Sequence, residues 1–125
     1  MNWGLKIKST DDQIIVPKGW GHEKWIVNNE KYCGKLLWFE SGKKCSWHYH
    51  KLKKETFFIQ SGLIEVAFSY EDSLQKASKI ILLPGDSFEV PVGLRHQMKA
   101  LKETELFEFS TQHFEDDSYR LEKGD

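Results

Sequence analysis

Turn-forming residues interrupt the sequence at short intervals, and this spacing limits what the chain can fold into. Ser61-Gly62, Pro84-Gly85-Asp86 and Pro91-Val92-Gly93 separate short apolar stretches that are rich in tryptophan, phenylalanine, isoleucine and valine. Such residues favour strands, and glycine and proline favour the turns between them. No stretch before residue 112 keeps the apolar period of an amphipathic helix over several turns. The sequence therefore predicts an all-β protein.

Ten segments are expected to form the strands of one antiparallel sandwich or barrel. They are Ile14–Val16, Trp25–Val27, Gly34–Glu40, Ser46–His50, Thr56–Gln60, Leu63–Tyr70, Lys79–Leu83, Ser87–Val90, His96–Ala100 and Glu105–Thr111. The polar segment Glu71–Lys79 is predicted to be a hairpin loop. With 125 residues we expect a single domain. It consists of an N-terminal strand or arm over 1–16, a barrel core over 17–111, and an acidic tail over 112–125 that forms a helical turn or covers the barrel edge.

Composition and charge argue against several classes of partner. The sequence has 18 basic and 19 acidic side chains, a net charge of −1, so composition offers no case for nucleic-acid binding. No apolar run approaches the length of a membrane span, and the first residues lack the apolar segment of a signal peptide. Cys33 and Cys45 are too few for a disulfide framework and lack a metal-type spacing. We therefore expect a cytoplasmic protein with reduced cysteines and no membrane partner.

Three of the five histidines lie in or beside strand-like segments near a glutamate. His48 and His50 are separated by one residue, which puts both side chains on the same face of a strand. Glu55 lies at the start of the next expected strand, and His96 begins a third. Imidazoles with one carboxylate suit a divalent metal ion that keeps positions open for a substrate. The alternative is that His48 and His50 are hydrogen-bonded residues of a polar face.

The wider pattern around these residues resembles the two signature motifs of the cupin superfamily. Residues 42–62 read Gly42-x5-His48-x-His50-x4-Glu55-x6-Gly62, and residues 85–96 read Gly85-x5-Pro91-x-Gly93-x2-His96. The resemblance implies a jelly-roll barrel, the double-stranded β-helix, in which one divalent metal ion per chain binds to His48, His50, Glu55 and His96. Zn, Mn, Fe, Ni or Co suits this set. The second motif usually ends in asparagine, which is not a ligand, and Ala100 stands there.

Further stretches resemble the cupin domain of type II phosphomannose isomerases. Lys18–Glu23 is similar to the Pro-Trp-Gly segment that opens that domain, and Glu108-Phe109 with Phe114–Arg120 is similar to its exit segment. The resemblance covers about residues 17–122. The chain departs from the family in three places and lacks its nucleotidyltransferase domain. His48 replaces a glutamine, Lys53 replaces an arginine, and Ser110 or Thr111 replaces a second glutamine.

This resemblance implies a metal-dependent isomerase of a sugar or sugar phosphate, such as mannose 6-phosphate, that works through a metal-stabilised enediolate. Glu108 is the candidate base, Arg120 the candidate for the enediolate or an anionic group, and Lys53 the candidate phosphate ligand. The alternatives are an exposed ion pair for Arg120, a solvated turn for Lys53 and a solvent-facing strand position for Glu108. Two other functions stay open. They are an iron-dependent dioxygenase or other oxidoreductase, and a non-catalytic barrel that binds a small molecule.

The aromatic residues predict apolar surface as well as core. Six of them are expected in the core or in a dimer face: Trp38, Trp47, Phe57, Phe58, Phe107 and Phe109. A twofold dimer is the commonest way to cover an apolar outer face, so we expect a homodimer that acts on a small polar or phosphorylated substrate. Trp20 and Trp25 are expected to flank a ligand or to pack on the barrel, and His22 and His113 are expected at the surface.

Overall fold

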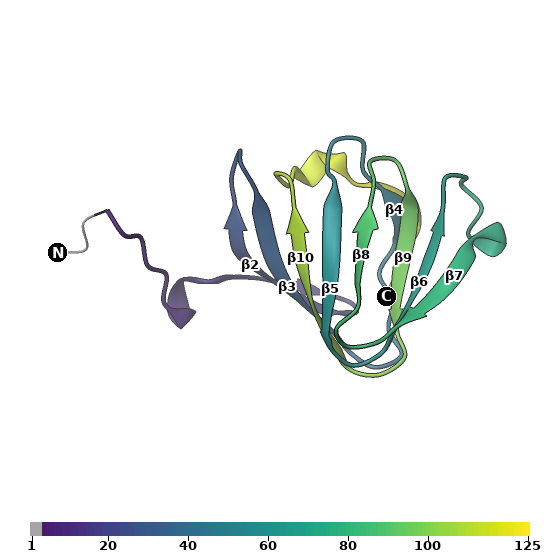
Figure 1. The fold of residues 1–125 in the computed structure, drawn as a ribbon, viewed down its shortest axis with the longest axis horizontal. Coiled ribbons are helices and arrows are strands. Elements are labelled where there is room, and N and C mark those ends of the chain that lie inside the picture. Colours follow the sequence, from purple (N-terminus) through teal and green to yellow (C-terminus); the bar gives the residue numbers. More distant parts are fainter. Residues whose placement is uncertain (1–3) are drawn as a thin grey trace.

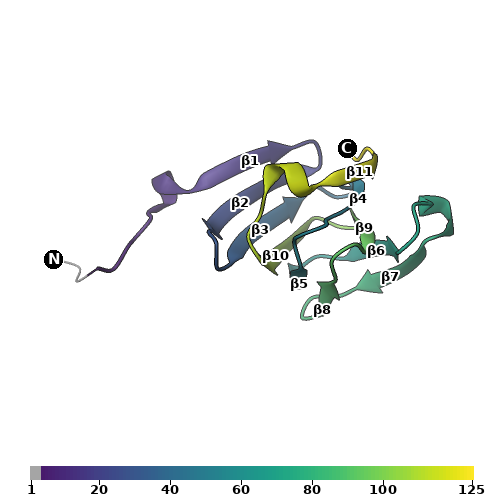
Figure 2. The same ribbon diagram turned by 90° about the horizontal axis from the view of Figure 1, so that it is seen from above.

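Two antiparallel β-sheets face each other in the computed structural model, which describes residues 4–125 (Figure 1, Figure 2). Sheet A has the strand order β1-β2-β3-β10-β5-β8, and sheet B has the order β11-β4-β9-β6-β7. Strands that are far apart in the sequence therefore pair with each other, as in a jelly roll. The described residues contain no α-helix. The predicted all-β jelly-roll fold is confirmed.

All ten predicted strands are present, with ends that differ by a few residues at most. The strands are β1 (Ile14–Lys18), β2 (Gly21–Asn28), β3 (Cys33–Phe39), β4 (Trp47–Tyr49), β5 (Glu55–Ser61), β6 (Ile64–Ser69), β7 (Ser78–Leu82), β8 (Ser87–Val90), β9 (Arg95–Ala100), β10 (Thr104–Ser110) and β11 (Tyr119–Glu122). Short 3-10 helices precede three of them: η1 (Thr10–Asp12), η2 (Leu74–Lys76) and η3 (Glu115–Asp117).

Alternation along the strands decides which side chains enter the space between the sheets. In β5, Phe57 and Ile59 are buried, whereas Phe58 is only partly buried and Gln60 is exposed. The buried side chains also change character along the strand, since polar Glu55 comes before the two apolar residues. One end of the barrel is therefore packed with apolar groups, and polar groups line the other. The apolar cluster is Trp20, Leu37, Phe39, Cys45, Phe57, Ile59, Ile64, Val66, Leu82, Val90, Met98, Ala100 and Leu106.

The predicted polar loop between β6 and β7 covers part of the outer face of sheet B. Trp47 is fully buried, and its indole N–H donates to the backbone carbonyl of Asp72 at 2.7 Å. The Asp72 carboxylate in turn accepts from the Arg95 guanidinium at 2.9 Å, and this guanidinium stacks on the ring of Tyr49. The two alternatives predicted for Trp47 are the core and a dimer face. The structure shows it buried, beneath the loop between β6 and β7.

The predicted acidic tail forms both a helical turn and an edge strand. The turn is η3, and the strand β11 pairs with β4 at the edge of sheet B. The last residue adds two hydrogen bonds to this edge: the backbone N–H of Asp125 donates to Lys44 O, and the Lys44 N–H donates to the Asp125 carboxylate, both at 2.9 Å. The tail therefore crosses from the end of β10 in sheet A to the edge of sheet B (Figure 2).

Gly62 in the β5–β6 turn has a conformation that only glycine tolerates well. Its φ is +98°, and a Cβ at this position would collide with the backbone oxygen of Glu103. The glycine of the first motif therefore lets the β5–β6 turn approach the β9–β10 turn.

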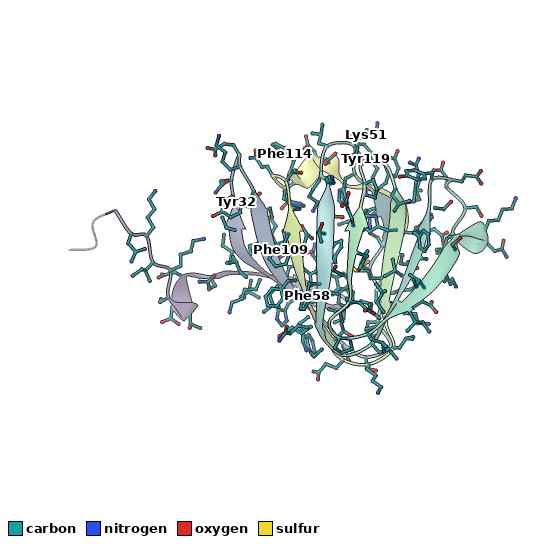
Figure 3. All side chains as sticks on the ribbon, viewed as in Figure 1. Tyr32, Lys51, Phe58, Phe109, Phe114 and Tyr119 are labelled. Carbon is teal, nitrogen blue, oxygen red and sulfur yellow. The ribbon has the colours of Figure 1, made fainter. Side chains whose placement is uncertain are left out.

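The outer face of sheet A and the N-terminal arm expose apolar groups. Phe107 stacks on Phe109 with 6.1 Å between ring centroids, and Phe109 is 55% exposed. Figure 3 shows Phe109 and Phe58 on the strands β10 and β5. The segment before β1 runs away from the barrel and exposes Leu5 and Ile7 (Figure 1). Residues 4–125 include no helix that is long and apolar enough to cross a membrane.

Candidate metal centre and cavity

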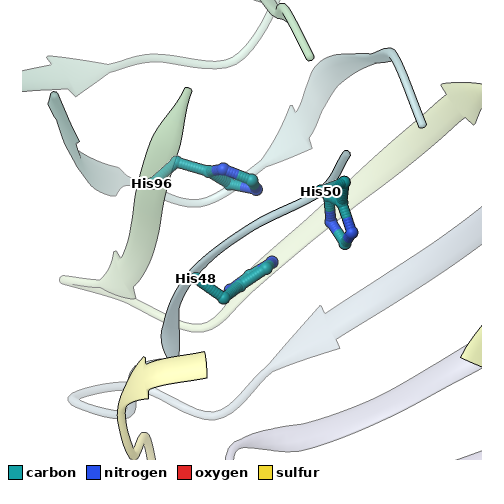
Figure 4. Close-up of side chains that lie close together, drawn as sticks. All are labelled: His48, His50 and His96. Atoms are coloured by element: carbon teal, nitrogen blue, oxygen red, sulfur yellow. The ribbon is translucent and has the colours of Figure 1, made fainter. Parts of the chain in front are cut away.

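Three histidine side chains from adjacent strands point to one place inside the barrel (Figure 4). His48 lies in β4, His50 follows two residues later, and His96 lies opposite His48 in β9. Each histidine offers one ring nitrogen, and these three atoms lie within 4.8 Å of one another. The spacing of two residues keeps His48 and His50 on one face, and the register between β4 and β9 adds His96.

Each imidazole is held by a hydrogen bond between its Nδ1 and a backbone carbonyl. The pairs are His48 with Ser46 at 2.9 Å, His50 with Asp117 at 2.8 Å, and His96 with Leu94 at 3.0 Å. Because a carbonyl only accepts, each Nδ1 carries a proton, and a neutral ring then presents a lone pair at Nε2. Histidines that bind metal ions are oriented in the same way.

Glu55, the first residue of β5, lies next to these rings. Its Oε2 is 3.2 Å from His96 Nε2, and its Oε1 is 3.5 Å from His50 Nε2. His50 Nε2 and Glu55 Oε2 are fully buried and lack a hydrogen-bond partner among the described residues. Buried polar atoms rarely stay without a partner. A cation between these lone pairs would satisfy them, so the four side chains fit a metal ion with three nitrogen ligands and one oxygen ligand.

Burial sets the protonation states of these groups. It lowers the pKa of His48 well below its ordinary value, and the neighbouring imidazoles lower it further. It also lowers the pKa of His50, although the charge of Glu55 opposes this shift. Burial alone would raise the pKa of Glu55, but the charge of the Lys53 ammonium at 2.9 Å opposes this effect, and the pKa of Glu55 lies well below the usual range. Neutral imidazoles and an ionised carboxylate are the forms that bind metal ions.

Lys53 lies between two buried carboxylates. Its Nζ is 2.9 Å from Glu55 Oε1, 3.1 Å from Glu108 Oε2 and 3.0 Å from His113 Nδ1. Burial alone would lower the pKa of Lys53, but the charges of Glu108 and Glu55 raise it. An ammonium has three N–H donors, and these contacts use all of them. The structure therefore does not support Lys53 as a phosphate ligand or as a solvated turn residue, because its side chain is buried and no donor remains for a substrate.

Glu108 lies inside the barrel in β10 and is buried. Its Oε2 accepts hydrogen bonds from Lys53 and from the Ser110 hydroxyl, at 3.1 and 3.2 Å. Burial and the charge of Glu55 raise the pKa of Glu108, against the effect of Lys53. The solvent-facing position that was the alternative for Glu108 is wrong.

A polar row on sheet A lies across the cavity from the histidines of sheet B. The strand register places Trp25 opposite Lys35, and Lys35 opposite Glu108. These side chains and the three histidines line a cavity of about 510 Å³. The Lys35 ammonium lies 3.4 Å from Glu23 Oε1 and 4.4 Å from the centroid of the Trp25 ring.

Arg120 lies at the mouth of this cavity. It is opposite His48 in the pairing of β11 with β4, and residues opposite each other share a face of a sheet. Arg120 therefore lines the cavity, but it stays exposed. The structure brings it near the predicted ligands and places it at the rim, away from Glu108 on the inner wall of sheet A.

His113 is not the surface residue that the sequence predicts. Its side chain is 13% exposed, and its backbone N–H donates to the Asn28 side chain at 2.8 Å. Burial and the charges of Lys35 and Lys53 lower the pKa of His113 to about 3. No local signal marks this position, because the fold of the tail places it. For Lys35 the sequence does contain a signal of its buried position, because a charged residue occupies an inward-facing position in an otherwise apolar strand.

No protein-family model and no curated protein matches the sequence. Solved structures do match the fold. The capsular polysaccharide assembling protein CapF from Staphylococcus aureus has a TM-score of 0.76 at 16% identity, over 91% of this chain and 36% of CapF. Oxalate decarboxylase from Bacillus subtilis has a TM-score of 0.78 at 20% identity, over 91% of this chain and 31% of the enzyme. KdgF from Halomonas sp. has a TM-score of 0.65 at 20% identity, over 76% of this chain and 81% of KdgF.

These neighbours are cupin-fold proteins. The chain spans about a third of the length of CapF and of oxalate decarboxylase, so it corresponds to one part of those larger proteins. At such low sequence identity the likeness shows the fold alone. Together, the order of the strands, the two motifs and these neighbours identify the chain as a domain with the jelly-roll fold of the cupins.

Proposed function

We propose that this protein is a metal-dependent isomerase of a sugar or a sugar phosphate, similar to the phosphomannose isomerases that its sequence resembles. One observation carries the proposal: unpartnered lone pairs of His50 and Glu55 converge with His48 and His96, beside Glu108, in a polar cavity. Such a ligand set suits one Zn, Mn, Fe, Ni or Co ion per chain.

The residues around this centre suit a proton transfer. An isomerase moves a proton between adjacent carbon atoms while the carbonyl and hydroxyl oxygens exchange roles, and it needs a base near these carbons. A bound divalent ion supplies polarisation of the carbonyl. We assign the proton transfer to Glu108, because it lines the cavity and its raised pKa makes it a better base than an ordinary glutamate. Lys53 holds Glu108 in position, and Arg120 at the mouth is available for an anionic group.

Two other functions would use the same centre. The neighbours carry names as different as capsular polysaccharide assembling protein and oxalate decarboxylase, so the fold does not select an activity. An iron-dependent dioxygenase of an apolar compound would be expected to have an apolar cavity. Lys35, Glu108 and His113 make this cavity polar, which favours a polar substrate. A non-catalytic barrel would bind such a compound without turnover.

The first experiment is the metal content of the purified protein, measured by elemental mass spectrometry for wild type and for His50→Ala. We expect about one divalent ion per wild-type chain, and its loss in the variant. His22→Ala is the matched control, because His22 stacks on Trp38 away from the centre and does not line the cavity. Absence of metal after reconstitution with several ions would overturn the proposal.

The metal-loaded protein is then given mannose 6-phosphate, and fructose 6-phosphate is followed by NMR. Slow conversion that is lost in Glu108→Gln supports an isomerase with this base. Metal binding without conversion of any sugar, sugar phosphate or sugar acid would contradict the isomerase and favour a binding protein. Oxygen uptake by the iron-loaded form with an added substrate would instead favour the oxidoreductase.

We also propose that the protein is a homodimer and is cytoplasmic. Sheet A exposes Phe109 on an apolar outer face, and the N-terminal arm exposes Leu5 and Ile7. A twofold dimer pairs the same surface of two copies, so that surface must be complementary to itself, as an apolar face is. We therefore propose that a second copy of the chain covers this face. Cys33 and Cys45 are buried free thiols, as is usual for a protein kept in a reducing compartment.

A further inference from the structure

Lys35 is a buried cation that the proposed proton transfer does not use. Its side chain is 2% exposed and lines the cavity. Among residues 4–125, its ammonium makes one hydrogen bond, a long contact of 3.4 Å with Glu23 Oε1. The Trp25 ring, 4.4 Å away, attracts the charge through its π face. An ammonium has three N–H donors, so two donors of Lys35 are left without an acceptor.

The other buried lysine of the cavity, Lys53, has an acceptor for each of its three N–H donors. Lys53 has three acceptors within 3.1 Å, namely Glu55, Glu108 and His113. Lys35 is therefore the buried cation of this cavity with donors available for a ligand. Buried donors without a partner cost free energy, and a ligand oxygen would remove that cost.

The buried charges around the centre indicate how much charge the ligand carries. Two lysines and three glutamates whose side chains are at most 15% exposed leave one net negative charge: Lys35, Lys53, Glu23, Glu55 and Glu108. The other charged residues of the lining lie nearer the surface, where water screens them: Lys18, Glu115, Arg120, Lys123 and Asp125. A divalent ion at the histidines changes the buried charge to one net positive charge. A singly charged anion would then make this buried set neutral, whereas a doubly charged phosphate would leave it negative, and unbalanced charge is costly among buried groups.

We propose that Lys35 binds a carboxylate of the substrate, so that the site takes a sugar acid or a similar hydroxy acid. The inference rests on the proposed metal centre, and it narrows the substrate of the proposed function from a sugar phosphate to a carboxylate. Lys35 and Glu108 are opposite each other on adjacent strands, where Cβ atoms are about 5 Å apart. A carboxylate on Lys35 would therefore bring the hydroxyl-bearing carbons of the same molecule close to Glu108.

Three ligands with the same ring test this inference by isothermal titration calorimetry. Mannuronate, mannose and mannose 6-phosphate carry a carboxylate, a hydroxyl and a phosphate at carbon 6. For the metal-loaded protein we expect mannuronate to bind at least about tenfold more tightly than the other two, since one charge-assisted hydrogen bond supplies this factor. Lys35→Met keeps the length of the side chain but removes its charge, and should abolish the preference at unchanged metal content.

Lys99→Met is the matched control, because Lys99 is exposed and lies outside this cavity. It should bind mannuronate like wild type. Tighter binding of mannose 6-phosphate, no binding of any of the three, or a preference that survives in Lys35→Met would each overturn the inference. If Lys35→Met does not fold, Lys35→Gln is judged by the same criteria.

Failure of the proposed function gives different results. A defective metal centre shows as missing metal in the wild-type protein before any titration. A wrong isomerase assignment shows as absence of turnover while the preference for mannuronate and its loss in Lys35→Met are both retained.

Discussion

The backbone carbonyl of Asp117 accepts the Nδ1–H hydrogen bond of His50 at 2.8 Å, although the two residues are 67 positions apart. The carboxylate of Asp117 accepts hydrogen bonds from the backbone N–H groups of the turn that follows His50, at distances from 2.9 to 3.2 Å. These donors are Lys51, Leu52 and Lys53. One buried residue of the tail thus orients a candidate metal ligand and fixes the turn that carries Lys53 to Glu55.

Asp117→Ala should weaken both the fold and the metal centre. It leaves backbone donors of the turn without their acceptor, which we expect to lower the free energy of unfolding by about 2–4 kcal/mol. Because the position of His50 depends on the same residue, metal affinity should fall roughly 10- to 100-fold. Urea unfolding of the metal-free protein and metal titration measure the two effects.

Asp116→Ala is the control for this prediction, since Asp116 is the exposed neighbour in η3. It should resemble wild type in both measurements. Equal behaviour of the two variants would show that the Asp117 contacts do not hold the centre.

Lys53→Met should strongly destabilise the metal-free protein. It leaves the carboxylates of Glu55 and Glu108 buried without the cation between them, which is expected to cost about 3–5 kcal/mol. Adding Glu108→Gln removes one of these charges and should restore part of the loss, because the two sites are coupled. Urea unfolding gives the free energies of the double-mutant cycle.

The control is Lys54→Met, whose ammonium is exposed and pairs with exposed Glu89 at 3.1 Å. Its effect should stay below about 1 kcal/mol. A mild effect of Lys53→Met, similar to that of Lys54→Met, would mean that Lys53 does not hold the two carboxylates.

His113 should make stability depend on pH. Its pKa is about 3 in the folded protein and about 6.5 in an unfolded chain. Between these values the unfolded chain binds more protons, so the free energy of unfolding falls as the pH drops from about 6.5 towards 3. Wild type should therefore lose more stability between pH 7 and pH 4.5 than His113→Gln does. His22→Gln, which lies outside the cavity, should lose as much as wild type. If His113→Gln loses as much stability as wild type over this pH range, His113 can be protonated in the folded protein without a loss of stability.

Phe109→Asp should shift the proposed homodimer towards the monomer. A carboxylate on the outer face of sheet A would be buried against a second copy, where it costs several kcal/mol without a partner. Mass measurement by light scattering coupled to size exclusion should give twice the chain mass for wild type and one chain mass for the variant. Ile81→Asp places the same charge on exposed β7 of sheet B and should leave the mass unchanged. A monomeric wild type would end the proposal.

The strands could be predicted because their signals are local. Aromatic and β-branched residues in short segments such as Thr56–Gln60, bounded by turns such as Ser61-Gly62, identify a strand without knowledge of its partners. The pair His48 and His50 could be placed on one face for the same reason, since a strand has a period of two residues. His96 and Glu55 were added by resemblance to the motifs, because nothing local shows that their strands meet those of the two histidines.

Tertiary structure decided what surrounds the ligands. Lys53 reads as a turn lysine among other lysines, and only the packing of β5 against β10 shows that it lies between two carboxylates. His113 and Asp117 read as residues of a polar tail, and they enter the site because the tail folds back to pair with β4. By itself the sequence determined the strands and the residue types at the centre, which depend on near neighbours in the chain. The charges and hydrogen bonds of the cavity depend on contacts between distant segments, and these exist only in the folded barrel.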